Sequence, residues 1–177
     1  MSAVAGALNA VMAVLYLSMW VGEGPVAFLT WNGVVVLLGK LALLSAACTI
    51  AAAFWGKSDP KRWPLLLHGF ALGALGVVQY GLTGVSVSIL TVMLLVVLMA
   101  LSLGAIDRAR GQSMTAVASL GFAALFLVLG FRWIGGGPGN HVGLLCLGVY
   151  FVFSAICFLM FAARPLPSDI VVGVLSH

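Results

Sequence analysis

The sequence predicts an all-α fold, a polytopic membrane bundle of six transmembrane helices. Of its 177 residues, 63% are hydrophobic and 7% are charged, whereas a soluble domain carries about 25% charged residues. The apolar residues gather in six runs, each close to the roughly 20 residues that a helix needs to cross the hydrocarbon core. Clusters of Gly, Pro and charged residues separate the runs. This composition excludes an ordinary soluble domain.

The six runs define the expected helices in chain order. The spans are expected at residues 3–21, 33–54, 64–82, 86–106, 114–133 and 142–163, with a tail at 164–177. Because little sequence is left between them, residues 1–177 are expected to form a single integral membrane domain. No Lys or Arg precedes the first run, so we expect a retained span rather than a cleaved signal peptide. The apolar tail is expected to pack against loops, the bilayer surface or a partner subunit.

Part of the sequence repeats at an offset of 109 residues. The positions Leu38-Gly39, Ser45-Ala46, Cys48 and Ala53 recur as Leu147-Gly148, Ser154-Ala155, Cys157 and Ala162. Both copies lie in apolar runs, so the repeated unit is expected to be a two-helix membrane hairpin. A hairpin starts and ends on the same side of the membrane. The repeat therefore predicts three hairpins in the same orientation, rather than the inverted repeats of many transporters; the middle copy matches weakly.

Positive charge indicates how the helices are oriented. The basic residues that follow the even-numbered spans are Lys57, Lys61, Arg62, Arg108, Arg110 and Arg164. The odd-numbered connections hold Arg132 at one edge, alongside Glu23. Because positive residues collect on the cytoplasmic side, both termini are expected to be cytoplasmic. The net charge of +4 is then explained by orientation, and no nucleic-acid partner is predicted.

Lys40 is the costliest residue to place in a membrane, because it lies about 10 Å inside the second expected span. A charge at the centre of a spanning helix costs about 2.5–3.5 kcal/mol and is a functional candidate by default. One interpretation is a cation that lines a polar cavity and meets an anionic solute or Glu23. The other is snorkelling, in which the ammonium group reaches the outer headgroups.

One face of the third expected span carries, by helical spacing, His68, Leu72, Leu75 and Gln79. Together with Lys40 and Tyr80, the two polar residues of this face could line a path for a small solute or a proton. The alternative is that His68 bonds to a carbonyl or to interfacial water. His68 could also be an axial haem or chlorophyll ligand, but no paired His or Met spacing supports such a site, and no cofactor is predicted.

Small and polar residues are expected to hold the helices together. Gly69, Gly73 and Gly76 share a face of the third span, and small residues at this spacing let helices approach closely in lipid. Asn9 and Tyr16 share a face of the first span and are expected to bond to a neighbouring helix.

Catalytic and metal-binding patterns are lacking. The chain has four acidic residues and no Ser-His-Asp set, clustered carboxylates or HExxH, so we expect no enzymatic activity and no catalytic residue. Cys48, Cys146 and Cys157 all lie in apolar runs and are expected to be free packing residues. No second ligand pair joins Cys146 and Cys157, so no metal site is predicted.

Residues 61–110 carry a family resemblance. They begin Lys61-Arg62-Trp63-Pro64, continue through a leucine run and end in Asp107-Arg108-Ala109-Arg110; Phe161-Ala162-Ala163-Arg164 is a similar ending. This pattern resembles the HdeD-like membrane proteins, whose short repeats open with Arg-Trp, a leucine run and Gly. The Trp-Pro-Gly turn frequent in that family is missing. The resemblance implies three hairpins, a bacterial inner membrane and an association with acid stress, and it brings no catalytic residues.

A second resemblance is to the acetate/succinate uptake channels. Gly143-Leu144-Leu145-Cys146 is similar to part of them, but their Asn-Pro-Ala-Pro-Leu-Gly signature is absent, since Asn9 is followed by Ala10 and Val11. The sequence therefore favours a non-enzymatic, HdeD-like inner-membrane protein that serves as a structural or accessory subunit beside other membrane subunits or itself. The alternative function is a small-solute or proton pathway.

Overall fold

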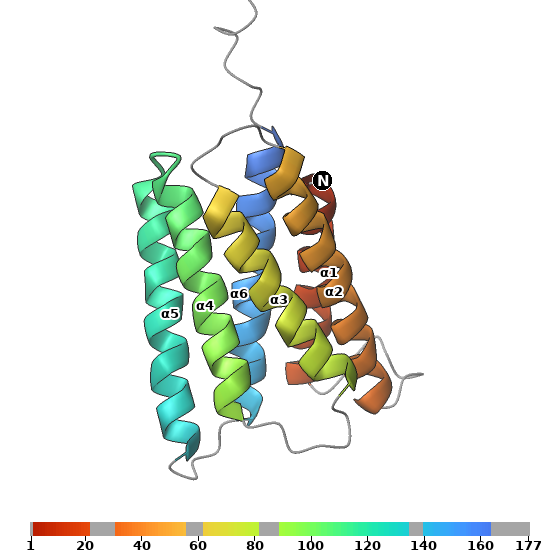
Figure 1. The fold of residues 1–177 in the computed structure, drawn as a ribbon. Coiled ribbons are helices and arrows are strands. Elements are labelled where there is room, and N and C mark those ends of the chain that lie inside the picture. The colour runs from red at the N-terminus through yellow and green to blue at the C-terminus, as the bar shows by residue number, and fades with distance from the viewer. Residues whose placement is uncertain (1, 22–30, 56–61, 82–88, 135–139, 164–177) are drawn as a thin grey trace, which may run out of the picture.

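The computed structural model describes residues 2–21, 31–55, 62–81, 89–134 and 140–163, and these residues are helical apart from the turn that follows Arg108. The helices run up and down one bundle (Figure 1). They are α1 (Ser2–Val21), α2 (Trp31–Trp55), α3 (Arg62–Gly81), α4 (Ile89–Arg108), α5 (Ser113–Ile134) and α6 (Asn140–Ala163). The predicted all-α class with six helices is confirmed.

The helices have the length and composition of membrane spans. Five of them, α1 to α4 and α6, are long and apolar enough to cross a membrane. The apolar part of α5 over which side chains are described, Ser113–Leu129, is shorter. The described chain is therefore that of a membrane-embedded protein. The expected packing of the tail at 164–177 and the contact between Lys40 and Glu23 fall outside the described residues.

The connection between α4 and α5 differs from the expectation, which ended the fourth span at residue 106. Helix α4 continues to Arg108, and backbone hydrogen bonds close its end. The Gln112 N–H donates to the Asp107 carbonyl at 2.9 Å, and the Gly111 N–H donates to the Arg108 carbonyl at 3.0 Å. Gly111 has a φ of 73°, a left-handed conformation that glycine adopts without a steric penalty. Asp107 is consequently a helical residue, not part of a loop.

Three pairs of helices pack most extensively: α2 with α3, α1 with α6, and α4 with α5. Helices α5 and α6 touch least among the neighbouring pairs. Both the start of α1 and the end of α6 lie at the upper end of the bundle (Figure 1). We call this the basic end, since Arg62, Arg108 and Arg110 lie there.

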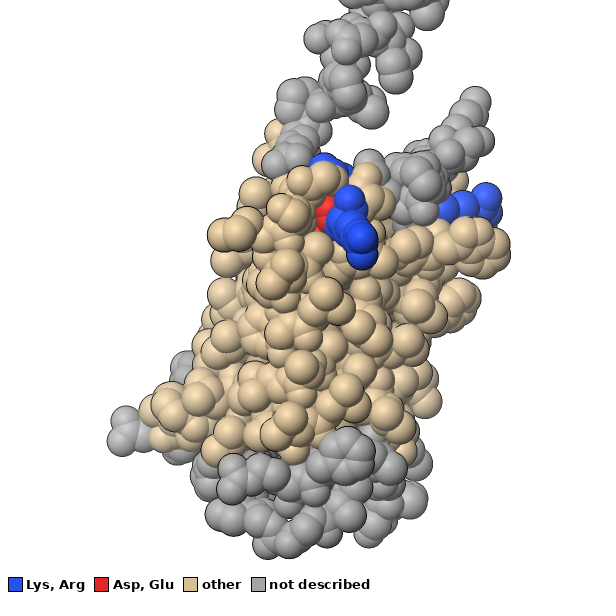
Figure 2. All heavy atoms as spheres, turned by 90° about the vertical axis from the view of Figure 1, so that its left-hand side faces the viewer, with Lys and Arg blue, Asp and Glu red and all other residues tan. Residues whose placement is uncertain are grey.

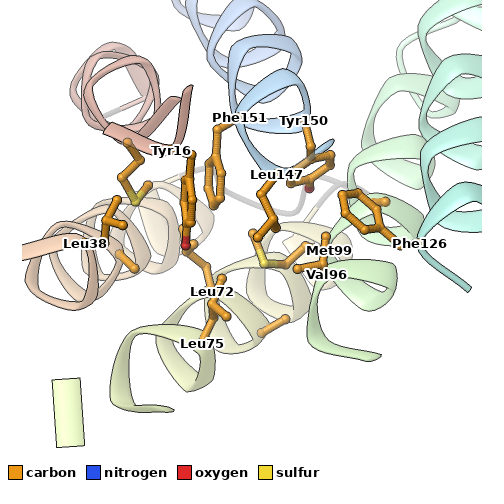
Figure 3. Packing of buried hydrophobic residues seen from close by; sticks show 14 of the residues in the cluster. Tyr16, Leu38, Leu72, Leu75, Val96, Met99, Phe126, Leu147, Tyr150 and Phe151 are labelled. Carbon is orange, nitrogen blue, oxygen red and sulfur yellow. The ribbon is translucent and has the colours of Figure 1, made fainter. Parts of the chain in front are cut away.

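The core runs along the bundle axis in two clusters. The larger, in the middle and lower part, includes Met12, Leu38, Leu72, Leu75, Val96, Met99, Phe126, Leu147, Tyr150 and Phe151 (Figure 3). The smaller includes Ala5, Ala53, Leu65, Leu66, Leu103, Ile106, Cys157 and Phe158, and so lies toward the basic end. Side chains of every helix contribute to these clusters.

The glycines singled out on α3 face α2. A Cβ atom on Gly69 would lie 2.6 Å from Cγ1 of Ile50, and one on Gly73 would lie 3.5 Å from Cβ of Ala46. One on Gly76 would lie 2.9 Å from the carbonyl oxygen of Gly39 on α2. The absence of side chains at these positions is what lets the two helix backbones approach.

Substituting alanine for Gly39 is expected to lower the free energy of unfolding by roughly 1 kcal/mol, although Gly→Ala in a helix usually adds about 1 kcal/mol. A Cβ on Gly39 would lie 2.7 Å from the backbone nitrogen of Tyr80, and a backbone atom cannot move aside cheaply. Unfolding in mixed detergent micelles measures the change. Gly121→Ala is the matched control, because nothing lies within 4 Å of its Cβ position. Equal stability of the two variants would contradict the close crossing.

Candidate functional site

Three helices meet at Asn9 of α1, which is fully buried. Its Nδ2 donates to Oγ of Ser154 on α6 at 3.1 Å, and its Oδ1 accepts from Oγ of Ser45 on α2 at 2.9 Å. Ser45 and Ser154 are the paired positions of the 109-residue repeat. The expected bond from Asn9 to a neighbouring helix is confirmed, and the two copies of the repeat converge on one side chain.

Tyr16 of α1 makes the second polar contact between helices. Its hydroxyl accepts a hydrogen bond from Nε2 of Gln79 on α3, which confirms the bond expected of Tyr16. Its ring stacks on Phe151 of α6, with ring centroids 5.4 Å apart and planes 7° apart. Figure 3 shows these two rings together, close to Leu72 and Leu38. Gln79 therefore ties α3 to α1 at the lower end of the core.

Lys40 is exposed on the surface of α2. Helix α2 begins at Trp31, two residues before the expected start of the span. Lys40 therefore lies about 14 Å from the start of the helix, compared with the expected depth of about 10 Å. Its Nζ lies 5.8 Å from the ring centroid of Tyr80, which is itself 50% exposed. A cation near an aromatic face is attracted by the ring. The structure thus brings Lys40 and Tyr80 together on the outside of the bundle.

His68 lies fully buried near the other end of α3. Its Nδ1 is 3.1 Å from the carbonyl oxygen of Met99 and 3.2 Å from Oγ of Ser102, both on α4. A carbonyl only accepts, so this bond requires a proton on Nδ1 and leaves Nε2 as a bare acceptor. Nε2 has no hydrogen-bond partner within the described part of the chain. The ring packs against Phe158, with centroids 5.4 Å apart.

The four residues considered for a pathway do not form one polar row among the described residues. His68 and Gln79 are about 16 Å apart along α3. Leu72 and Leu75, which share their face, are fully buried between them in the apolar core (Figure 3). Lys40 and Tyr80 lie on the exposed side. Lys40 lies beside Tyr80, Gln79 bonds to Tyr16, and His68 lies apart from both of these contacts.

A pocket at the basic end brings together groups that the sequence reasoning did not combine. It is lined by Leu65, Leu103, Ile106, Asp107, Arg110, Cys157, Phe158 and Phe161, from α3, α4, α6 and the turn after α4. The Cys157 thiol donates to Oδ2 of Asp107 at 3.6 Å. Oδ1 of Asp107 has no partner among the described residues, although the side chain is fully buried.

Arg110 covers one wall of the pocket. Its guanidinium carbon lies 3.3 Å from the ring centroid of Phe161, a close cation–π contact. Asp107 and Arg110 are three residues apart across the end of α4, so opposite charges face one pocket. The one sequence signal for this site is an acid directly after an apolar run, within Ile106-Asp107-Arg108. That pattern is equally typical of a connecting loop.

Metal ligands do not gather in the part of the chain that the structure describes. No group of three or more His, Cys, Asp or Glu side chains there is placed to hold an ion. Cys48, Cys146 and Cys157 are free thiols, and Cys157 is engaged with Asp107. An axial ligand would use Nε2 of His68, an atom enclosed in the packed core beside Phe158.

Comparison of the chain with protein-family models, with curated proteins and with solved structures finds no match to any of them. A function for the chain therefore has to be inferred from its fold and from the residues of the bundle.

Proposed function

We propose that this chain is a non-enzymatic, HdeD-like protein of the bacterial inner membrane that serves as a structural or accessory subunit packed against another membrane protein. The observation that carries the proposal is the outer face of α5, the helix with the least support from its neighbours. The exposed residues of this face include Met114, Val117, Ala118, Gly121, Leu125 and Val128. A second transmembrane helix that packs on this face would supply the contacts that α5 lacks.

Gly121 distinguishes this face from the rest of the surface. The other helical glycines with described surroundings each lie against a neighbouring helix: Gly6, Gly39, Gly69, Gly73, Gly76, Gly104 and Gly148. Gly121 alone among them has nothing within 4 Å of its Cβ position. Glycine weakens a helix relative to alanine, and in lipid its use is to let another helix approach. Gly121 is consistent with a helix–helix contact to a partner.

The interior supports a packing role over transport. Several of its polar groups bond to one another across helices, as Asn9 does with Ser45 and Ser154, and Tyr16 with Gln79. Polar groups that line a path would instead be left for water or solute. The proposal includes the absence of catalytic activity. In the described bundle the single buried acid, Asp107, accepts a hydrogen bond from the Cys157 thiol and shares a pocket with Arg110.

The proposal includes three hairpins in one orientation, with both termini in the cytoplasm. Equivalent repeat positions have equivalent roles: Gly39 and Gly148 each lie at a close helix contact, and Ser45 and Ser154 each bond to Asn9. The most extensive packing, α2 with α3, α4 with α5 and α6 with α1, also recurs three times around the bundle. Reporter fusions at both termini test the orientation, and a periplasmic signal from either would contradict it.

Extraction from the native membrane in mild detergent, followed by native gels and mass spectrometry, tests the accessory role. We expect the chain to migrate with another membrane protein at fixed stoichiometry. Gly121→Trp is expected to release the chain from that assembly, since the indole would occupy the partner's place. Val77→Trp, at a 57% exposed position of α3, is the matched control and should leave the assembly intact. A wild-type chain that migrates alone would overturn the proposal.

A solute or proton pathway is the second candidate. It is favoured by two buried acceptors on one face of α3 without partners in the described chain, Nε2 of His68 and Oε1 of Gln79. Proton or acetate flux into liposomes distinguishes the two functions. A pathway predicts flux that falls when His68 is replaced by Phe, whereas an accessory subunit gives the same background flux with either residue.

A further inference from the structure

Lys40 is a charged side chain on the outside of the bundle, away from the basic end. On the side of α5, the described charged side chains gather at the upper end of the molecule, and the described surface below them is uncharged (Figure 2). Lys40 lies on α2, about 14 Å from Trp31, the residue at which α2 begins at the lower end of the bundle. A charge among lipid-facing residues is costly unless the ammonium group meets an anion.

The part of the chain that the structure describes offers no anion to Lys40. The acidic residue of the described ranges is Asp107, which lies at the basic end and accepts a hydrogen bond from the Cys157 thiol. The ring of Tyr80, with its centroid 5.8 Å from Nζ, attracts the positive charge. The ring face provides no oxygen acceptor for the three N–H donors of the ammonium group. An acceptor for them has to come from outside the described residues.

The crossing of α2 and α3 holds Lys40 and Tyr80 together. Gly39 directly precedes Lys40, and a Cβ atom on Gly39 would lie 2.7 Å from the backbone nitrogen of Tyr80. Because the two backbones are so close, the Tyr80 ring lies within reach of the Lys40 side chain. Tyr80 is the next-to-last residue of α3, so the pair lies beside the lower end of that helix (Figure 1). Tyrosine is typical of the membrane interface, where the lipid headgroups lie.

Exposed apolar side chains adjoin the pair on both helices. Leu44 follows Lys40 by one turn of α2 and is 54% exposed, and Val77 precedes Tyr80 by about one turn of α3 and is 57% exposed. Both lie on the side of the pair that faces the middle of the bundle, since α2 starts and α3 ends at the lower end. A polar pair toward the interface and an apolar surface toward the bilayer centre match the two parts of a phospholipid.

We propose that Lys40 and Tyr80 bind the phosphate of an anionic phospholipid, namely phosphatidylglycerol, in the leaflet at the lower end of the bundle. The Lys40 ammonium group and the Tyr80 hydroxyl donate to phosphate oxygens, and an acyl chain lies over Leu44 and Val77. A zwitterionic lipid carries its own ammonium group near the phosphate and is held more weakly. The site lies on α2 and α3, away from the outer face of α5, and does not depend on the accessory role.

The test is lipid retention by the whole chain in native mass spectrometry after reconstitution with defined lipid mixtures. We expect phosphatidylglycerol to be retained about fivefold more than phosphatidylcholine, since one lysine near an anionic membrane surface contributes roughly that factor. Inorganic phosphate in excess should not displace the lipid, because the acyl chain contributes to its binding. Equal retention of the two lipids, or displacement by inorganic phosphate, would overturn the proposal.

Three variants assign the site. Lys40→Met is expected to release one phosphatidylglycerol per chain, because it removes the charge and leaves an apolar side chain that lipid accommodates without loss of folding. Lys40→Arg keeps the charge and should keep this lipid. Arg62→Gln is the matched control: Arg62 also lies over an aromatic ring, that of Phe54 with its centroid 5.0 Å away, but at the basic end of the bundle. Its loss should leave this lipid in place.

Two outcomes for these variants would overturn the proposal. Unchanged retention of phosphatidylglycerol by Lys40→Met would mean that Lys40 pairs with an acidic residue, in the chain or in a partner subunit, and not with lipid. An equal loss for Lys40→Met and Arg62→Gln would mean that retention follows the net charge of the chain and not a site at Lys40.

Discussion

Replacing Asn9 with leucine is expected to lower the free energy of unfolding by about 1–3 kcal/mol. The substitution removes both hydrogen bonds that join α1 to α2 and to α6. Hydrogen bonds between transmembrane helices contribute about 0.6 kcal/mol on average and up to about 1.7 kcal/mol each. Asn9 is fully buried, so water cannot replace the lost partners. Unfolding in mixed detergent micelles at fixed lipid content measures the change.

Single substitutions of the two serines divide this effect. Ser45→Ala and Ser154→Ala should each lose roughly half of it, and the effect of each should disappear when Asn9 is already leucine. Ser18→Ala is the matched control on the same helix, because among the described residues Ser18 bonds within α1, to the carbonyl of Leu15 at 2.8 Å. Additive effects of Asn9→Leu and Ser45→Ala would contradict the shared cluster.

This cluster shows how far the sequence leads and where it stops. The 109-residue offset identified Ser45 and Ser154 as equivalent, and helical spacing placed Asn9 on a bonding face. Both inferences depend on one helix at a time. That the two serines reach the same amide depends on how three helices cross, and those crossings are set by contacts such as Gly148 against Leu17 of α1. Periodicity contains no such information.

The face of α3 illustrates a different limit. Helical spacing correctly grouped His68, Leu72, Leu75 and Gln79, and in the structure this face is turned inward. The interpretation of this face as a polar row depends on the residues at its two ends, His68 and Gln79. Whether water can pass along the face depends on the residues between them. Leu72 and Leu75 are fully buried against the core. The residues that pack against this face of α3 belong to the neighbouring helices, so the sequence of α3 alone does not determine them.

Asp107 was missed because a helix end was misplaced by two residues. An acid and two arginines after an apolar run are typical of a solvated loop. The backbone instead continues as helix to Arg108, since Gly111 provides the left-handed residue that closes it. Two more helical residues turn Asp107 toward Cys157 of α6, and a surface charge becomes a buried one. An error of two residues in a helix end therefore has its largest effect where charged residues directly follow the apolar run.

The second large effect is expected from Phe126→Ala, which should lower the free energy of unfolding by about 3 kcal/mol. Phe126 is fully buried and lies edge-on to Tyr150 of α6, with ring planes at 88°. Burial of a Phe side chain relative to Ala accounts for about 3–5 kcal/mol in water-soluble cores. The low end applies in lipid, because the unfolded helices stay in an apolar medium and only the packing contacts and the cavity count.

Phe70→Ala separates packing from hydrophobicity. Phe70 is 64% exposed on α3 and faces outward, so its ring meets apolar surroundings in the folded and the unfolded states alike. Its removal should change stability by less than about 0.5 kcal/mol. Equal losses for the two variants would mean that burial in this bundle adds nothing beyond contact with lipid. A large loss for Phe126→Ala alone would instead show that aromatic packing against Tyr150 is what holds α5 against α6, since backbone contact between these helices is so limited.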